Sequence, residues 1–184
     1  MIWEEAGSEN TIDTLRIALD ACGKRQIEHI IIASNTGATI RKALELGAGD
    51  LFVTCVTHHV GFHGPGVDDM LDDERAHLAS HGVKVLTTTH VLAGVDRAVR
   101  NQYGGIYPPE IIANSLRMLG QGLKVCVEIS IMALDAGLVP YGKEVVAVGG
   151  SGSGADTAAI IVPEHSNNAF GLRVHEILCK PRTW

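Results

Sequence analysis

The chain has 184 residues, the length of one domain, and carries 21 Asp and Glu against 15 Lys and Arg, for a formal net charge of −6. This acidic balance disfavours nucleic acid as a partner, because phosphate backbones bind clustered basic surfaces. No apolar run reaches the roughly 20 residues of a membrane span, and the N-terminus lacks the pattern of a signal peptide. We therefore expect a cytoplasmic protein with no membrane partner, and its four scattered cysteines are expected to be reduced thiols.

Helical and strand-like segments alternate along the chain. Helices are expected in six segments, of which residues 68–81 form a more polar surface helix: residues 12–22, 40–47, 68–81, 95–99, 108–119 and 124–136. Short runs typical of buried strands occupy six others: residues 27–33, 51–56, 83–89, 145–149, 158–162 and 173–179. This order predicts a single α/β domain over residues 1–184, with three α/β/α layers and a mostly parallel sheet.

The helix expected at residues 124–136 is apolar on nearly all sides, which predicts a central buried helix. Lys124 and Glu128 lie one turn apart on it, so we expect them to pair rather than Glu128 to act as a catalytic acid. Cys55 lies three residues before His58, but no Arg follows closely enough to hold a phosphate beside its sulfur. A buried thiol is therefore the better interpretation of Cys55.

Ligands of such folds bind at the carboxyl ends of the strands, where four loops are expected: residues 34–39, 57–66, 87–90 and 149–157. The first loop combines hydroxyls, a glycine and the start of a helix, which together can bind an anion. Ordinary capping of the helix by Ser or Thr is the alternative. The candidate ligand-binding residues of this loop are Ser34, Asn35, Thr36, Gly37, Ala38 and Thr39.

The last loop has four glycines in the six residues from 149 to 154, and successive backbone amides in such a loop can form an anion nest. Its sequence fits neither a Walker loop nor GxGxxG, and a strand-like run follows it. A flexible hairpin loop is the alternative. The candidate binding residues here are Gly150, Ser151, Gly152, Ser153, Gly154, Asp156 and Thr157.

The second loop is rich in histidine and begins with the candidate binding residues Thr57 and His58, followed by His59 and His63. Adjacent residues of a strand point to opposite faces, so His58 and His59 would not easily share an ion, and no metal is expected. The histidines are interpreted as solvated loop residues, with a ligand contact or a general base as alternatives.

Two segments, residues 30–39 and residues 144–158, resemble in their order the C-terminal α/β domain of pyruvate kinase in a stand-alone form. The resemblance covers nearly the whole chain. In pyruvate kinase this domain is regulatory: the first loop holds a phosphate of fructose bisphosphate and the last loop closes over the sugar. It implies that Ser34, Thr36, Gly37 and Thr39 meet one phosphate, and that the loop at residues 150–154 closes from the other side. The barrel with the catalytic residues is absent, so pyruvate kinase activity is not implied.

Neither candidate loop contains Lys or Arg, which favours one phosphate held by amides and hydroxyls over several. We therefore expect a regulatory or binding domain for a monophosphate metabolite or a mononucleotide such as FMN. The alternatives are a flavin- or phosphate-cofactor-dependent enzyme that uses His58, His59, His63 or His90, and a structural subunit of a larger complex. Large apolar residues near the ends, Ile2, Trp3 and Trp184, favour a homo-oligomer.

Overall fold

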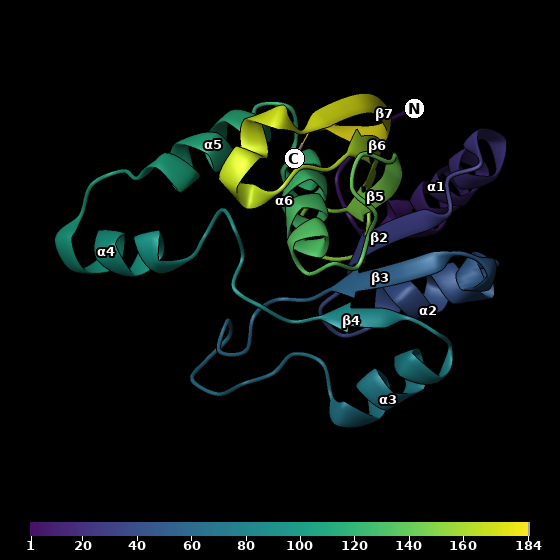
Figure 1. Ribbon diagram of the computed structural model, residues 1–184, viewed down its shortest axis with the longest axis horizontal. Helices are drawn as coiled ribbons and strands as arrows, with labels where there is room; N and C mark the ends of the chain where they lie inside the picture. Colours follow the sequence, from purple (N-terminus) through teal and green to yellow (C-terminus); the bar gives the residue numbers. More distant parts are fainter. Residues whose placement is uncertain (184) are drawn as a thin grey trace.

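The computed structural model describes residues 1–183, and its centre is one seven-stranded sheet (Figure 1). The spatial order of the strands is β1-β7-β6-β5-β2-β3-β4. Their bounds are β1 Ile2–Glu5, β2 His29–Ala33, β3 Phe52–Val56, β4 Lys84–Leu86, β5 Val145–Gly149, β6 Thr157–Val162 and β7 Arg173–Thr183.

The sheet is mostly parallel, as the alternation of elements predicts. Strands β5, β2, β3 and β4 are parallel neighbours, and β1 lies parallel to β7. Strand β6 is antiparallel to both β5 and β7. The glycine-rich segment is therefore the loop of a β5–β6 hairpin, and it still leaves the carboxyl end of β5 beside the loops that follow β2 and β3.

Helices cover both faces of the sheet, which confirms the α/β class (Figure 1). Leu15 of α1, Ile40 of α2 and Leu78 of α3 belong to the core on one face, whereas α6 supplies most of the core on the other. The helix bounds are α1 Thr11–Arg25, α2 Ala38–Glu45, α3 Asp72–Ser80, α4 Val95–Tyr103, α5 Pro108–Arg117 and α6 Gln121–Asp135. No helix within residues 1–183 is long and apolar enough to cross a bilayer.

Helix α6 is buried along almost its whole length, as its apolar sequence predicts. It packs closely on the β5–β6 hairpin because glycines lie on both sides of the contact. A Cβ atom on Gly122 would overlap the side chain of Thr157, and one on Gly149 would lie 2.7 Å from the carbonyl oxygen of Gly122. This close approach brings the first turns of α6 to the carboxyl edge of the sheet.

The N-terminal strand β1 has no counterpart in the sequence analysis, because its partner β7 lies more than 170 residues away and no local pattern announces the pairing. Trp3 on this strand is partly buried, and its indole Nε1 donates to the backbone oxygen of Asp156 over 2.9 Å. Trp3 is therefore no exposed anchor for another subunit. Ile2 is exposed, and Trp184 lies outside the described residues.

Candidate functional site

A cavity of about 770 Å³ lies at the carboxyl edge of the sheet, between the loops that follow β2, β3 and β5 and one face of α6. Most residues predicted to bind a ligand line this one cavity, although they come from distant parts of the chain. They are Ser34, Asn35, Thr36, Ala38, Thr39, Thr57, His58, Gly150, Gly152, Ser153 and Gly154.

The loop after β2 lines part of the cavity and leads into helix α2. Gly37 is the N-cap of α2, with a φ of 83°, and it has no side chain that could bond to the helix start. Ser34 is buried, and its Oγ accepts a long hydrogen bond of 3.3 Å from the amide of Thr39. The amides of Thr36, Gly37 and Ala38 make no hydrogen bond within residues 1–183. Free amides at a helix start favour an anion.

Hydrogen bonds hold the base of the glycine-rich loop in place. The Asp156 carboxylate accepts hydrogen bonds from the amides of Ser151 (3.1 Å) and Gly7 (3.3 Å), and Ala155 N donates to Thr11 Oγ1 over 3.0 Å. Three predicted binding residues at the base of this loop do not line the cavity: Ser151, Asp156 and Thr157. Gly37 of the first loop does not line it either. The amides of residues 152–154 are left without a partner among the described residues.

Three cations line the cavity without a carboxylate partner, and the sequence analysis missed all three. Within residues 1–183 the side chains of Lys42 and Arg97 make no hydrogen bond or ion pair, and Arg117 bonds only to the neutral amides of Gln121 and Asn114. Lys42 lies one turn after Ala38 on α2, so helical spacing was a usable signal for it. Arg97 and Arg117 come from α4 and α5, and no local pattern links them to the loops.

The inner wall of the cavity is a buried ionic network on α6. Lys124 and Glu128 pair as expected, and Glu128 Oε1 also accepts from the amide of Leu92 over 3.0 Å. His90 Nε2 lies 3.1 Å from the carbonyl oxygen of Thr57, so this nitrogen carries a hydrogen. Its Nδ1 lies 3.9 Å from Glu128 Oε2. The charge of Glu128, the one acidic residue of the lining, is thus balanced by Lys124.

His58 is held in one tautomer by its neighbours. Its backbone amide donates to Asn35 Oδ1 over 3.0 Å, which orients the Asn35 amide so that Nδ2 donates to His58 Nε2 over 3.2 Å. His58 Nδ1 therefore carries the hydrogen, and it faces Asp69 Oδ2 at 3.1 Å. Burial lowers the pKa of His58, although the hydrogen bond to Asp69 acts in the opposite direction. The imidazole is consequently neutral at neutral pH.

Cys55 confirms the interpretation of a buried thiol. Its side chain has no exposed surface, its Sγ donates to the carbonyl oxygen of Ser34 over 3.3 Å, and burial raises its pKa to about 12. A thiol with this pKa is protonated at neutral pH and is a poor nucleophile.

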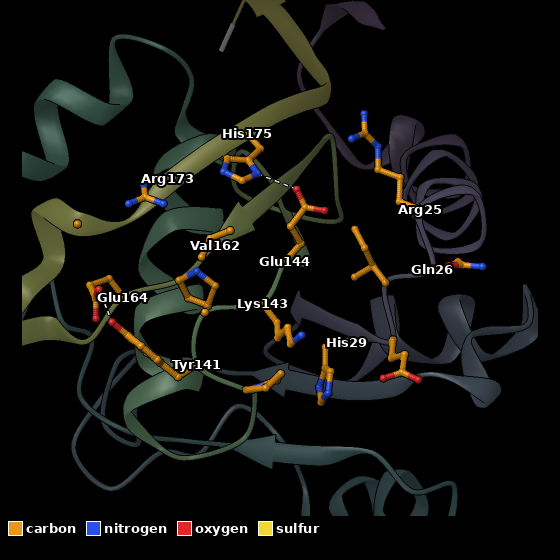
Figure 2. Close-up of a pocket in the computed structure, with 16 residues that line it drawn as sticks. Arg25, Gln26, His29, Tyr141, Lys143, Glu144, Val162, Glu164, Arg173 and His175 are labelled. Atoms are coloured by element: carbon orange, nitrogen blue, oxygen red, sulfur yellow. Dashed lines mark hydrogen bonds and ion pairs between the residues drawn. The ribbon is translucent and has the colours of Figure 1, made fainter.

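A second cavity, of about 830 Å³, lies at the opposite edge of the sheet (Figure 2). Its lining mixes both signs of charge: His175 Nδ1 is 2.7 Å from Glu144 Oε1, and Tyr141 donates to Glu164 over 3.3 Å. Lys143 and Arg173 extend into the same region in Figure 2. None of the residues predicted to bind a ligand lies here, and the amino edge of a parallel sheet is not the usual ligand edge.

Comparison with known proteins gives a family and a set of distant structural neighbours. The family described as pyruvate kinase, alpha/beta domain, matches residues 13–161. Two similar solved structures are a pyruvate kinase from Cryptosporidium parvum, with 14% identity and a TM-score of 0.41, and the pyruvate kinase of that organism in complex with ADP, with 14% identity and a TM-score of 0.40. Each match covers 82% of this chain but only 22% of the kinase chain.

Proposed function

Since the chain belongs to the pyruvate kinase alpha/beta domain family, we propose that its carboxyl-edge cavity binds a phosphate-bearing small molecule and that this binding is regulatory. The observation that carries the proposal is the charge of the cavity. A protein with a net charge of −6 places three uncompensated cations, Lys42, Arg97 and Arg117, around one cavity beside two loops with free amides. The three cations repel one another when the cavity is empty, and an anionic ligand would relieve that repulsion.

The two loops suit a phosphate, and the rest of the cavity leaves room for more. Free amides and hydroxyls at residues 34–39 and 150–154 provide the nest. The volume lies within the roughly 300–1,000 Å³ of typical small-molecule sites, so a mononucleotide such as FMN fits by size. The two loops contain no Lys or Arg, which by itself favours a single phosphate. The three cations from α2, α4 and α5 extend the ligand class to metabolites with a second phosphate.

An enzyme that uses a bound flavin or another phosphate-bearing cofactor is the second candidate. One observation favours it: two imidazoles that line the cavity lie beside carboxylates. His58 pairs with Asp69, and His90 lies near Glu128. A carboxylate that orients an imidazole is a common arrangement for proton transfer. Turnover of a reducible substrate by flavin-loaded protein would favour this candidate.

The test measures binding of inorganic phosphate, FMN and fructose 1,6-bisphosphate by calorimetry and by the shift in melting temperature, after mass spectrometry of any co-purified molecule. A ligand specific for the native state must raise the melting temperature. In the variant Lys42→Gln/Arg117→Gln we expect the dissociation constant of the best ligand to rise at least tenfold.

The matched control is Lys143→Gln/Arg173→Gln, which removes the same charge from the opposite edge of the sheet. If both double variants weakened ligand binding equally, the loss would come from the change in net charge alone, which would contradict the proposed site. Absence of binding for all three ligands, with no co-purified molecule, would contradict the proposed function.

A further inference from the structure

The loop between β3 and α3 folds back on itself and brings two of its histidines together. Gly61 N donates to the carbonyl oxygen of Val67 over 2.8 Å, which closes the loop at its base. The ring of Phe62 stacks on His58 with centroids 3.7 Å apart. This folding places His63 and Asp69 beside His58, which lies two residues after the buried end of β3.

Asp69 bridges the two imidazoles through its two oxygens. Its Oδ2 lies 3.1 Å from His58 Nδ1, and its Oδ1 lies 2.8 Å from His63 Nδ1. One potential ligand atom from each of the three side chains lies within 4.8 Å of the others.

We propose that His58, His63 and Asp69 form a site for a divalent transition-metal ion such as Zn²⁺. Two imidazoles and one carboxylate are a ligand set that proteins use for Zn²⁺ and Fe²⁺, with positions left for water or substrate. The adjacent residues His58 and His59 would not easily share an ion. The structure instead joins His58 to His63, five residues further on, and adds a carboxylate from beyond the loop.

The site opens toward the carboxyl-edge cavity. His58, His63 and Phe62 all belong to its lining, whereas the Asp69 side chain is only 13% exposed. The His63 side chain is 60% exposed, so an ion can reach the cluster from solvent. Because His58 and His63 line the cavity, an ion held here would lie beside it and could bind a phosphate or carboxylate oxygen of a ligand. The metal proposal itself does not depend on that ligand.

Asn35 gives the proposal a distinctive signature. Without metal, Asn35 Nδ2 donates to His58 Nε2. Once an ion takes His58 Nδ1, the hydrogen of the neutral ring moves to Nε2 and faces the Asn35 NH₂ group, which is a donor. Asn35→Asp replaces that donor by an acceptor and completes the carboxylate–histidine–metal arrangement. This variant should bind the ion about tenfold more tightly, the lower end of typical outer-shell effects.

The experiment titrates the full chain, freed of metal by a chelator and kept in phosphate-free buffer, with Zn²⁺ by calorimetry and with Co²⁺ by visible absorption. We expect one ion per chain. Mutation of a residue that only orients a metal ligand typically weakens metal binding by about 10- to 100-fold. His63→Ala and Asp69→Asn each remove a ligand itself, so each should weaken Zn²⁺ binding by at least that much. His63 is exposed, so its variant keeps the test valid if Asp69→Asn does not fold.

Two controls separate this cluster from other histidines. His77 and His81 lie one turn apart with ring centroids at 4.6 Å and can bind a metal adventitiously, so His77→Ala/His81→Ala tests that source. His59→Ala tests the neighbouring histidine of the same loop. Both variants should keep the ion. The proposal is overturned if no ion binds, if His63→Ala binds as well as the unchanged chain, or if either control removes the ion. Phosphate binding by the metal-free chain is measured separately, so the two proposals can fail independently.

Discussion

Gly37 shows how one residue shapes the first loop. Its φ of 83° lies in the left-handed region, which favours glycine. A Cβ atom at this position would also overlap the Glu74 carboxylate, and that carboxylate is held in place by Arg41, whose Nε donates to it over 2.9 and 3.0 Å. The hydrogen bond from Arg41 holds the pKa of Glu74 below its usual value. Glycine is therefore required here for two separate reasons.

Gly37→Ala should destabilise the protein more than Gly47→Ala, and urea unfolding measures both. Gly47 also has a positive φ, of 97°, but its Cβ would meet no heavy atom within 4 Å. Gly47→Ala should therefore lower the free energy of unfolding by the backbone strain alone, about 1 kcal/mol. Gly37→Ala adds a clash with a buried carboxylate and should lower it by about 2–4 kcal/mol. Equal losses in the two variants would contradict this account of the loop.

At the scale of elements, α4 differs from every other α-helix of the described chain. None of its nine residues is buried, Gly94 precedes it and Gly104 follows it with a φ of 76°. In Figure 1 it extends away from the sheet and its covering helices. A helix of this length without packing is marginal in water. Yet it supplies Arg97 to the cavity, so its stability and ligand binding should be coupled.

Trypsin should cut first within α4, after Arg97 or Arg100, because local opening exposes this helix before the packed ones. Arg16 and Lys24 provide internal controls, since they are as exposed but lie on α1, which packs against the sheet. Saturating ligand should slow the α4 cleavage several-fold if Arg97 contacts it. The fragments are identified by mass spectrometry at early times. First cleavage in α1 would contradict the marginal stability of α4.

At the scale of the whole molecule, the N-terminal segment supports the glycine-rich loop from across the sequence. Strand β1 pairs with β7, and Trp3, Gly7 and Thr11 all bond to residues 155–156. The loop is therefore held by these three N-terminal residues as well as by its own hairpin. We therefore expect the positions of the amides of residues 152–154 to depend on this long-range contact.

Trp3→Phe keeps a ring in place but removes the indole N–H that bonds to Asp156. We expect a loss of about 1 kcal/mol in the free energy of unfolding, the typical value of one hydrogen bond. Hydrogen exchange at the amides of residues 150–154 should also become faster. Ile2→Ala, on the same strand but with half of its surface exposed, should affect that exchange little. Unchanged exchange in Trp3→Phe would show that the loop is held without the N-terminal strand.

The sequence by itself determined the α/β class, six of the seven strands, the buried α6 and the two loops whose free amides line the cavity. Each of these has a local signal: a period of 3.6 residues, a β-branched run, or hydroxyls and glycines in a strand-end loop. Patterns within about ten residues carry such information because the backbone and nearby side chains alone create it.

Only the tertiary structure decided which side chains meet at the cavity. Lys42, Arg97 and Arg117 come from three helices, and Asp69 joins His58 to His63 only after the loop has folded back. Strand β1 likewise finds its partner at the other end of the chain. These contacts depend on how the elements pack, and packing places residues side by side without any rule about their separation in sequence. The charge of the cavity is therefore a property of the assembled sheet and helices, although every loop that frames it can be read from the sequence.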